Sequence, residues 1–299
     1  IASIGMCIGA AAVGRRALTA SSGPGLSLYS EHIGLAVMME LPLVIVDVQR
    51  LGPATGGATT VGQGDVQFAH WVTAGGYPMI VLAPSTAVEC ATLTMEAFAL
   101  AQRFRTPVIV LTDKELNLTR VTVDWTELPA PEPVTVVPET VPAALLGDNK
   151  VVRFTGSSYD ERRLITKDPV AVERLNRRLI AKIEAHREEL ERGRLDLEPG
   201  ARTLLVSFGT TSGAMEVAVS EARRRGKRVA SVVVQSLWPL PAHLLAHAAS
   251  GVERVVVGEL NPGLYAREVR GLLPDHAVVS LQRTDGQLIT PEMFLEWCL

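Results

Sequence analysis

The sequence predicts an α/β protein built from two domains, each with a parallel β-sheet. Short apolar runs of strand length alternate with longer helical patterns over the first part of the chain and again over its last third. This alternation is typical of parallel sheets covered by helices on both faces. A proline-rich stretch separates the two regions. We therefore expect a first domain over residues 1–123, a connector and long helix over 124–199, and a second domain over 200–299.

The first domain is predicted to alternate helix and strand from its start. Ile1 to Val13 is small and apolar, which favours a helix packed closely on a neighbour. Ser85 or Thr86 is suited to cap a later helix, and Glu89 is placed for a capping box. The expected strands cover residues 17–20, 43–48, 79–83 and 107–112, and the expected helices cover residues 1–13, 27–39, 67–73 and 87–104.

The middle of the chain is predicted to be an extended connector followed by one long helix. Five prolines punctuate the connector: Pro129, Pro131, Pro133, Pro138 and Pro142. Asp168 is placed as an N-cap and Pro169 as the first helical residue, and the helical pattern runs to about Arg192. The many charged residues of this helix are interpreted as a solvated face with ion pairs one turn apart.

The second domain repeats the alternation of strand and helix. Thr203 to Phe208 is an apolar run, and a Gly-Thr-Thr-Ser-Gly turn leads from it into a helix that ends at Arg225. The further expected strands cover residues 228–237, 252–259 and 277–281, and the further helices residues 241–249, 263–273 and 291–297. This pattern indicates a small parallel α/β domain of about a hundred residues.

Composition excludes several classes of function. The formal net charge of −3 and the pI of about 6.1 give no reason to expect nucleic acid or an anionic membrane as a partner. No apolar run reaches the roughly 18 residues that a membrane helix needs. Cys7, Cys90 and Cys298 stand far apart, so we expect no metal or cluster site in this chain and a reducing, cytoplasmic setting. Because the chain opens with Ile1 inside a helical pattern, we expect the native polypeptide to have a preceding part.

Two polar loops follow neighbouring strands, and they are the candidate binding site. Ser21-Ser22-Gly23-Pro24-Gly25 breaks the first strand from the following helix, and Asp47-Val48-Gln49-Arg50 ends the next strand. The carboxyl ends of parallel strands are where such sheets bind ligands. Glycine lets the backbone approach a ligand closely, and helix starts offer N–H donors. Arg50 adds a rigid fork suited to a carboxylate or a phosphate.

Four sequence stretches together carry a resemblance to a known family. They are SSGPGLSL at residues 21–28, DVQRLGPATG at 47–56, Thr112-Asp113-Lys114, and Gly258-Glu259-Leu260-Asn261. In this order they resemble the alpha subunit of 2-oxoacid:ferredoxin oxidoreductases, most closely the 2-oxoglutarate type. The resemblance implies that residues 1–123 form the pyrimidine-binding domain for thiamine pyrophosphate. It implies that residues 200–299 form a transketolase C-terminal-like domain.

The same resemblance implies a reaction, its cofactors and its partners. The implied reaction is oxidative decarboxylation of a 2-oxoacid to an acyl-coenzyme A, with electrons passed to ferredoxin. Thiamine pyrophosphate would be shared with a beta subunit that holds Mg²⁺ and [4Fe–4S] clusters, in a hetero-oligomer with dimerised alpha-beta units. The cofactor would face Ser21, Ser22 and Gly23, and Ser22 and Arg50 would bind the substrate, with Arg50 pairing with its carboxylate. The family glutamate that activates the pyrimidine ring would lie upstream of Ile1.

The residues leave other functions open. The chain could be a non-catalytic structural or regulatory subunit that completes a partner's site, or it could belong to another thiamine enzyme. An oxidoreductase for a branched-chain, aryl or pyruvate-like 2-oxoacid also fits. Asp47 is interpreted as a cap for nearby backbone, and His32 and His70 as interfacial residues rather than proton shuttles. Asp113 has either a capping or an interface role, and Glu259 and Asn261 are expected at a domain or subunit contact.

Overall fold

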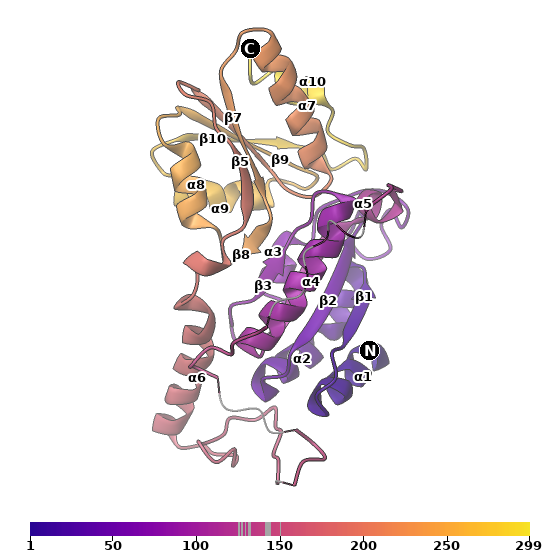
Figure 1. The fold of residues 1–299 in the computed structure, drawn as a ribbon, viewed down its shortest axis with the longest axis vertical. Helices are drawn as coiled ribbons and strands as arrows, with labels where there is room; N and C mark the ends of the chain where they lie inside the picture. The colour runs from indigo at the N-terminus through magenta and orange to yellow at the C-terminus, as the bar shows by residue number, and fades with distance from the viewer. Residues whose placement is uncertain (125, 127, 129, 131–132, 141–144, 150) are drawn as a thin grey trace.

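A computed structural model describes residues 1–124, 126, 128, 130, 133–140, 145–149 and 151–299. The elements form two α/β domains, one above the other, with a long helix running beside the first (Figure 1). The first sheet has the order β1-β2-β4-β3-β8, and all its pairs are parallel except that of β3 with β8. Its strands are β1 (Leu18–Ser21), β2 (Leu43–Gln49), β3 (Ile80–Leu82), β4 (Pro107–Asp113) and β8 (Ser236–Trp238).

The helices of the first domain form because their apolar residues pack on this sheet. Tyr29, Ile33 and Val37 line the buried side of one of them and lie in the same apolar cluster as Ile45. The N-terminal cap of another follows the predicted pattern, since Thr86 accepts the Glu89 N–H at 3.1 Å. The helices are α1 (Ala2–Ala12), α2 (Gly23–Met39), α3 (Val66–His70), α4 (Ala87–Phe104) and α5 (Lys114–Leu118).

The second sheet has the order β10-β9-β6-β7-β5, and only the pair of β5 with β7 is antiparallel among its described strands. Its strands are β5 (Gly193–Asp196), β6 (Thr203–Ser207), β7 (Val229–Val234), β9 (Arg254–Glu259) and β10 (Ala277–Gln282). Its helices are α7 (Thr211–Arg224), α8 (Ala242–Ala249), α9 (Leu264–Leu272) and α10 (Pro291–Leu295). The prediction of two α/β domains with mainly parallel sheets is confirmed.

One predicted strand of the second domain is wrong. Residues 228–237 were expected to form a single strand, but the chain breaks at Gln235 into β7 and β8, which belong to different sheets. Trp238 explains the change of sheet, because its backbone pairs with Val81 and its indole N–H donates to the Val66 carbonyl at 3.1 Å. The second domain therefore supplies an edge strand to the first, and one apolar cluster continues through both domains.

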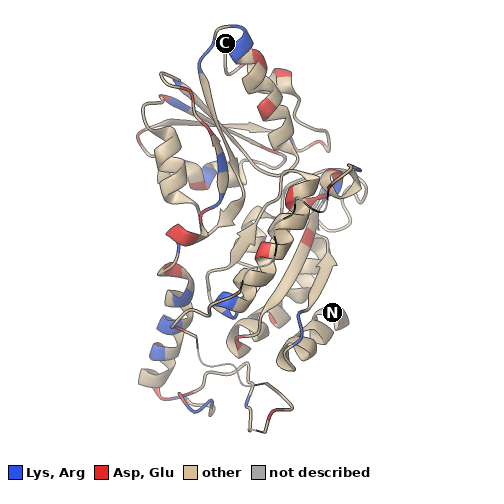
Figure 2. Cartoon of the chain, in the orientation of Figure 1, with Lys and Arg blue, Asp and Glu red and all other residues tan. Residues whose placement is uncertain are grey.

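The long helix is shorter than the sequence predicts. It is α6 (Pro169–Glu184), capped by Asp168 as expected, and it ends before a short 3₁₀ turn, η2 (Glu188–Leu190). Leu175, Leu179, Ile183 and the charged Lys182 line its buried side. Lys and Arg recur along the helix (Figure 2), and the predicted solvated face holds for Arg174 and Arg177 but not for Lys182. The chain must then extend to form β5, which the sequence pattern did not indicate, so the helix cannot continue to Arg192.

The connector before α6 has no long regular element among its described residues. Pro133 and Pro138 lie in irregular backbone, as predicted, whereas Pro129, Pro131 and Pro142 lie outside the described residues. Over the residues that the structure describes, no helix combines the length and apolar character needed to cross a bilayer.

Candidate functional site

The Ser21–Gly23 turn lies at the carboxyl edge of the first sheet. β1 ends at Ser21, whose partner in the parallel register is Asp47 of β2. Ser22 occupies the N-cap position of α2 in extended conformation, but its side chain makes no capping hydrogen bond. The turn thus presents a helix start with Ser22 and Gly23 at the strand ends, which is the location expected for a ligand loop.

Gly23 and Gly25 pack closely against neighbouring side chains in this turn. A Cβ atom added at Gly23 would overlap both carboxylate oxygens of Asp65, and one added at Gly25 would overlap the Ser21 hydroxyl. A side chain at either position would force the turn or its neighbours to move. The contact also places the Asp65 carboxylate directly against the turn. Sequence reasoning missed Asp65, because the Gly- and Thr-rich loop before it gave no sign of which residue would fold back.

Two carboxylates lie behind the turn, one buried (Asp47) and one half-buried (Asp65). Asp47 is fully buried, and neither of its oxygens has a hydrogen-bond partner among the described residues. The interpretation of Asp47 as a backbone cap is therefore wrong. Burial raises the pKa of Asp47 well above its usual range, and the nearby Asp65 charge raises it further. Burial also raises the pKa of Asp65 to about 6, against the opposing charge of Arg50.

Arg50 is held on the second loop beside Asp65. Its Nη1 donates to the Thr55 carbonyl at 2.7 Å, and Leu51 forms a bridge with Gly57 that closes the loop. This bond uses one of the five N–H donors of the guanidinium. The Arg50 charge acts on the Asp65 carboxyl, which in turn contacts Gly23. The structure therefore brings Arg50 and the Ser21–Gly23 turn together through a residue that lies 15 positions after Arg50.

The second domain fixes the far end of this loop through Gln63. The Gln63 side-chain N–H donates to the Phe208 carbonyl at 3.1 Å. Its side-chain oxygen accepts the Thr211 hydroxyl at 3.0 Å and the Leu260 N–H at 3.1 Å. Its main-chain carbonyl accepts from Asn261 Nδ2 at 2.8 Å, which confirms the expected interface role of Asn261. A single buried glutamine therefore ties the loop to two segments of the second domain, the turn between β6 and α7 and the residues directly after β9.

Asp113 and Glu259 show how strand ends hold the neighbouring helices. Asp113 accepts the Leu116 N–H at 3.1 Å and the Thr210 N–H at 2.9 Å, so it has both roles that the sequence left open. Glu259 accepts the N–H groups of Tyr265 and Ala266 at 2.9 and 3.0 Å. It caps α9 within its own domain instead of bridging the domains.

The two histidines singled out by the sequence differ in their surroundings. His70 stacks on Trp71 at 3.8 Å and on Trp238 at 3.7 Å between ring centroids, so it lies where β8 joins the first domain. Burial, with a contribution from the Arg187 charge, lowers the pKa of His70 to about 4. His32 is half-buried, with Nδ1 3.5 Å from the Glu31 carboxylate. A neutral, stacked His70 fits an interfacial role and not a proton shuttle near pH 7.

Family models match both domains of the chain. Residues 1–147 match the thiamine-diphosphate-binding domain of pyruvate flavodoxin/ferredoxin oxidoreductases, and residues 201–294 match core domain II of pyruvate:ferredoxin oxidoreductase. The chain is 35% identical to 2-oxoglutarate synthase subunit KorA of Methanothermobacter marburgensis, over 99% of this chain and 83% of that protein. The chain belongs to the alpha-subunit family of the 2-oxoacid:ferredoxin oxidoreductases. The predicted resemblance is confirmed.

Two further members of the family bear on substrate and architecture. The ketoisovalerate oxidoreductase subunit VorB of Methanothermobacter thermautotrophicus is 34% identical, over 99% of this chain and 81% of that protein. The 2-oxoglutarate:ferredoxin oxidoreductase from Magnetococcus marinus, solved with 2-oxoglutarate, coenzyme A and succinyl-CoA bound, superposes with a TM-score of 0.90 at 28% identity. The superposition covers 99% of this chain and 55% of that one, so this chain spans about half the length of its structural relative.

Proposed function

We propose that this chain is the alpha subunit of a 2-oxoacid:ferredoxin oxidoreductase that converts 2-oxoglutarate to succinyl-coenzyme A with reduction of ferredoxin. The observation that carries the proposal is the convergence of the Ser21–Gly23 turn, Asp65 and Arg50 at the carboxyl edge of a parallel sheet. The proposed division into a thiamine pyrophosphate pyrimidine domain, residues 1–123, and a second domain, residues 200–299, follows from this assignment. The names of the KorA relatives and of the Magnetococcus marinus enzyme support the choice of substrate.

The residues of this edge fit the pyrimidine end of thiamine pyrophosphate. The helix start at Ser22 has no side-chain cap, and Asp47 keeps a buried carboxyl without a partner among the described residues. When bound, thiamine pyrophosphate supplies the electron sink for the loss of carbon dioxide. No group of three or more His, Cys, Asp or Glu side chains in the described part of the chain is placed to hold a metal ion. We therefore assign Mg²⁺ and the [4Fe–4S] clusters to a beta subunit.

Arg50 is the proposed substrate-orienting residue. A 2-oxoacid loses carbon dioxide when its carboxylate is turned out of the plane of the carbonyl group. A guanidinium can fix that orientation through two parallel hydrogen bonds, whereas lysine supplies a point charge. The bond to Thr55 holds the Arg50 side chain in place before the substrate arrives. Ser22 stands on the opposing turn, where its hydroxyl can donate to the substrate.

The proposed partners are the beta subunit, ferredoxin and coenzyme A, in a hetero-oligomer with dimerised alpha-beta units. Exposed apolar residues on the first two helices support a partner surface beside the cofactor turn, because Met6 is 70% and Leu28 59% exposed. Cys7, Cys90 and Cys298 are free thiols, which supports a reducing, cytoplasmic setting.

Kinetics of the assembled enzyme test the role of Arg50. Arg50→Ala is expected to lower kcat/KM for 2-oxoglutarate by about 10²-fold or more, because a buried charge-assisted pair contributes about 2–5 kcal/mol. Arg50→Lys should recover part of that loss. Affinity for thiamine pyrophosphate, measured by calorimetry, should stay within about twofold. Arg225→Ala, on the far side of the second domain, is the matched control. Near-normal kcat/KM in Arg50→Ala would show that Arg50 is structural.

A branched-chain 2-oxoacid is the second candidate substrate, because the VorB relative matches almost as well as KorA does. The ratio of kcat/KM for 2-oxoglutarate and 2-oxoisovalerate decides between the two substrates. A ratio above one supports the proposal. An assembly that shows no turnover with any 2-oxoacid, although its clusters and cofactor are present, would instead indicate a non-catalytic subunit.

A further inference from the structure

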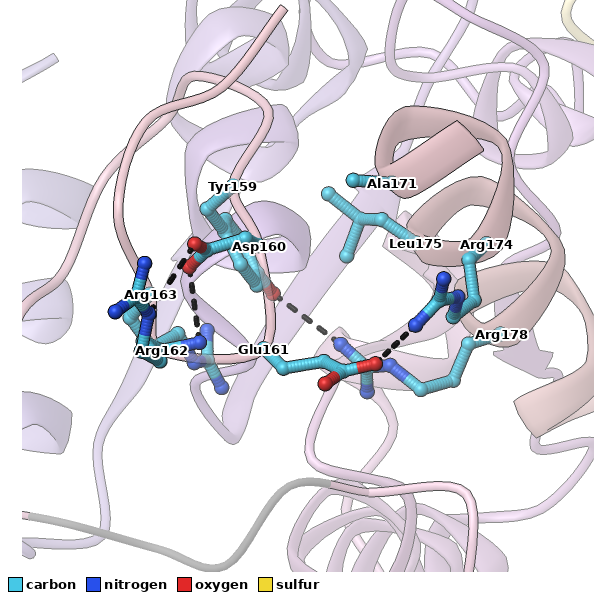
Figure 3. A pocket seen from close by; sticks show the side chains of 9 residues that line it. All are labelled: Tyr159, Asp160, Glu161, Arg162, Arg163, Ala171, Arg174, Leu175 and Arg178. Atoms are coloured by element: carbon cyan, nitrogen blue, oxygen red, sulfur yellow. Dashed lines mark hydrogen bonds and ion pairs between the residues drawn. The ribbon is translucent and has the colours of Figure 1, made fainter. Parts of the chain in front are cut away.

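A second cavity lies at the opposite edge of the first domain from the proposed cofactor turn. It has a volume of about 440 Å³ and lies between the segment 159–163 and helix α6 (Figure 3). Glu40, which borders it from behind, ends α2 and precedes the amino end of β2, whereas Arg50 follows the carboxyl end of that strand. This cavity is therefore separate from the site described above.

A single buried carboxylate behind the cavity serves three cations. Glu40 is fully buried and accepts hydrogen bonds from Arg163 at 2.9 Å and from Arg178 at 2.8 and 2.9 Å. The Lys182 ammonium lies 3.3 Å from the same carboxylate, and the Tyr159 hydroxyl donates to it at 3.0 Å. Burying several like charges around one counter-ion is costly unless further negative charge is available.

The carboxylates at the front of the cavity do not balance the positive charge of the arginines there. Arg174 pairs with Glu161, and Arg162 lies 3.6 Å from Asp160, so each of these arginines meets one carboxylate (Figure 3). The Nη1 atom of Arg163 is buried and has no hydrogen-bond partner among the described residues. Among the described residues that line the cavity, four arginines face two carboxylates: Arg162, Arg163, Arg174 and Arg178 against Asp160 and Glu161.

The cavity also has an apolar wall. The Tyr159 ring is buried, with the Arg163 guanidinium 4.5 Å from its centroid, and Leu175 and Ala171 line the helix side. An apolar wall beside convergent polar groups is typical of pockets that bind small organic molecules, and the volume lies in their range.

We propose that this cavity binds a small phosphate monoester with an apolar or aromatic body. A phosphate monoester carries close to two negative charges near neutral pH, which matches the surplus of two cations. Guanidinium groups bind phosphate oxygens through paired hydrogen bonds, and the described cations that line the cavity are arginines and not lysines. An acidic segment of a partner protein would also meet the charge, but the concave shape favours a small ligand. The proposal does not depend on the proposed oxidoreductase activity.

Calorimetry on the full chain in its native assembly tests the proposal, with adenosine 5′-monophosphate as the probe and adenosine as the uncharged comparison. The monophosphate is expected to bind with a Kd below about 1 mM and at least tenfold more tightly than adenosine. Arg174→Ala and Arg162→Ala should each weaken that binding by about tenfold, because each removes a charge-assisted contact. Arg177→Ala is the matched control, since Arg177 lies on the same helix with its side chain 79% exposed and pairs with Glu173.

Each outcome decides the proposal. Phosphate-dependent binding that is weakened by Arg174→Ala and Arg162→Ala but not by Arg177→Ala supports it. Equal binding of adenosine and its monophosphate overturns it, as does binding that all three substitutions leave unchanged. Absence of binding in the native assembly, with binding to the free chain, would show that a partner's acidic segment fills the cavity and would also overturn it. Circular dichroism confirms that the exposed-arginine variants remain folded.

Discussion

Replacing Glu40 by glutamine should destabilise the protein by about 3 kcal/mol at pH 7. Burial would raise the pKa of Glu40, but the Arg178 hydrogen bond and the charges of Lys182, Arg178 and Arg163 outweigh it and lower the pKa to about 2. A pKa held at about 2 instead of the ordinary 4.5 corresponds to about 3 kcal/mol of stability at neutral pH. Glutamine keeps the shape but leaves the buried cations without their counter-ion.

The sign of the pH dependence follows from the lowered pKa. The stability that Glu40 contributes is complete above pH 4.5, and it is lost as the pH falls from about 4.5 towards 2. The free energy of unfolding of the native protein should therefore approach that of Glu40→Gln in acid. The difference between the two should shrink by about 1.5 kcal/mol between pH 4.5 and pH 3.

Urea unfolding of the two proteins at pH 7, 4.5 and 3 measures this difference. Glu173→Gln is the matched control, because Glu173 is 61% exposed and pairs with Arg177 on the same helix that binds Glu40. This control should change stability by no more than about 0.5 kcal/mol at any of these pH values. A Glu40→Gln difference that stays constant from pH 7 to pH 3 would refute the argument from charge.

Three other predictions concern the domain contact and the second core. Gln63→Leu should lower the free energy of unfolding by about 3 kcal/mol or more. It leaves the buried Leu260 N–H, Thr211 hydroxyl and Phe208 carbonyl without their hydrogen-bond partner. An unchanged urea midpoint would contradict this prediction. Gly258→Ala should lower the free energy of unfolding by about 1–3 kcal/mol, since the new methyl group overlaps the Phe294 ring. Adding Phe294→Leu should restore part of the lost Tm. A double variant with no recovery of Tm would indicate backbone strain instead. His70 should show no titration by NMR between pH 7.5 and 5.5, because its pKa is lowered to about 4; a midpoint near 6.5 would show that its stack is open to water.

The sequence locates elements well where a local signal is strong. The α4 boundaries are predicted to the residue, because Thr86 supplies the cap and a continuous apolar face ends at Phe104. The break at Gln235 carries a weaker signal, since Gln235 and Ser236 interrupt the apolar run but no Gly, Pro, Asn or Asp marks a turn there. The sheet that β8 joins is decided by the contact of Trp238 with Val66, 172 positions away, which no local pattern contains.

The residues of the candidate site also fall into those that the sequence reveals and those that it does not. The glycine turn and Arg50 are recognisable, because each follows an apolar strand and brings residue types suited to an anionic ligand. Asp65 and Glu40 could not be recognised, since their properties come from contacts between segments far apart in the chain. Asp65 lies against Gly23, and Glu40 meets Arg178 across 138 positions. The sequence does not show whether an Asp or Glu side chain will be neutral or charged, because burial and neighbouring charges in the folded chain decide its pKa.

Hydrogen bonds connect the contact between the two domains to the candidate site. Gln63, whose side-chain amide and main-chain carbonyl are bonded to the second domain, lies two residues before Asp65. Asp65 N–H in turn donates to the Gln49 side chain at 3.1 Å, at the end of the strand that leads into Arg50. The loop from Arg50 to Asp65 is thus fixed at its start by the first sheet and at its end by the second domain. The second domain therefore helps to set the position of the Asp65 carboxylate beside Arg50, and a substitution that loosens Gln63 should raise KM for the 2-oxoacid before the fold is lost.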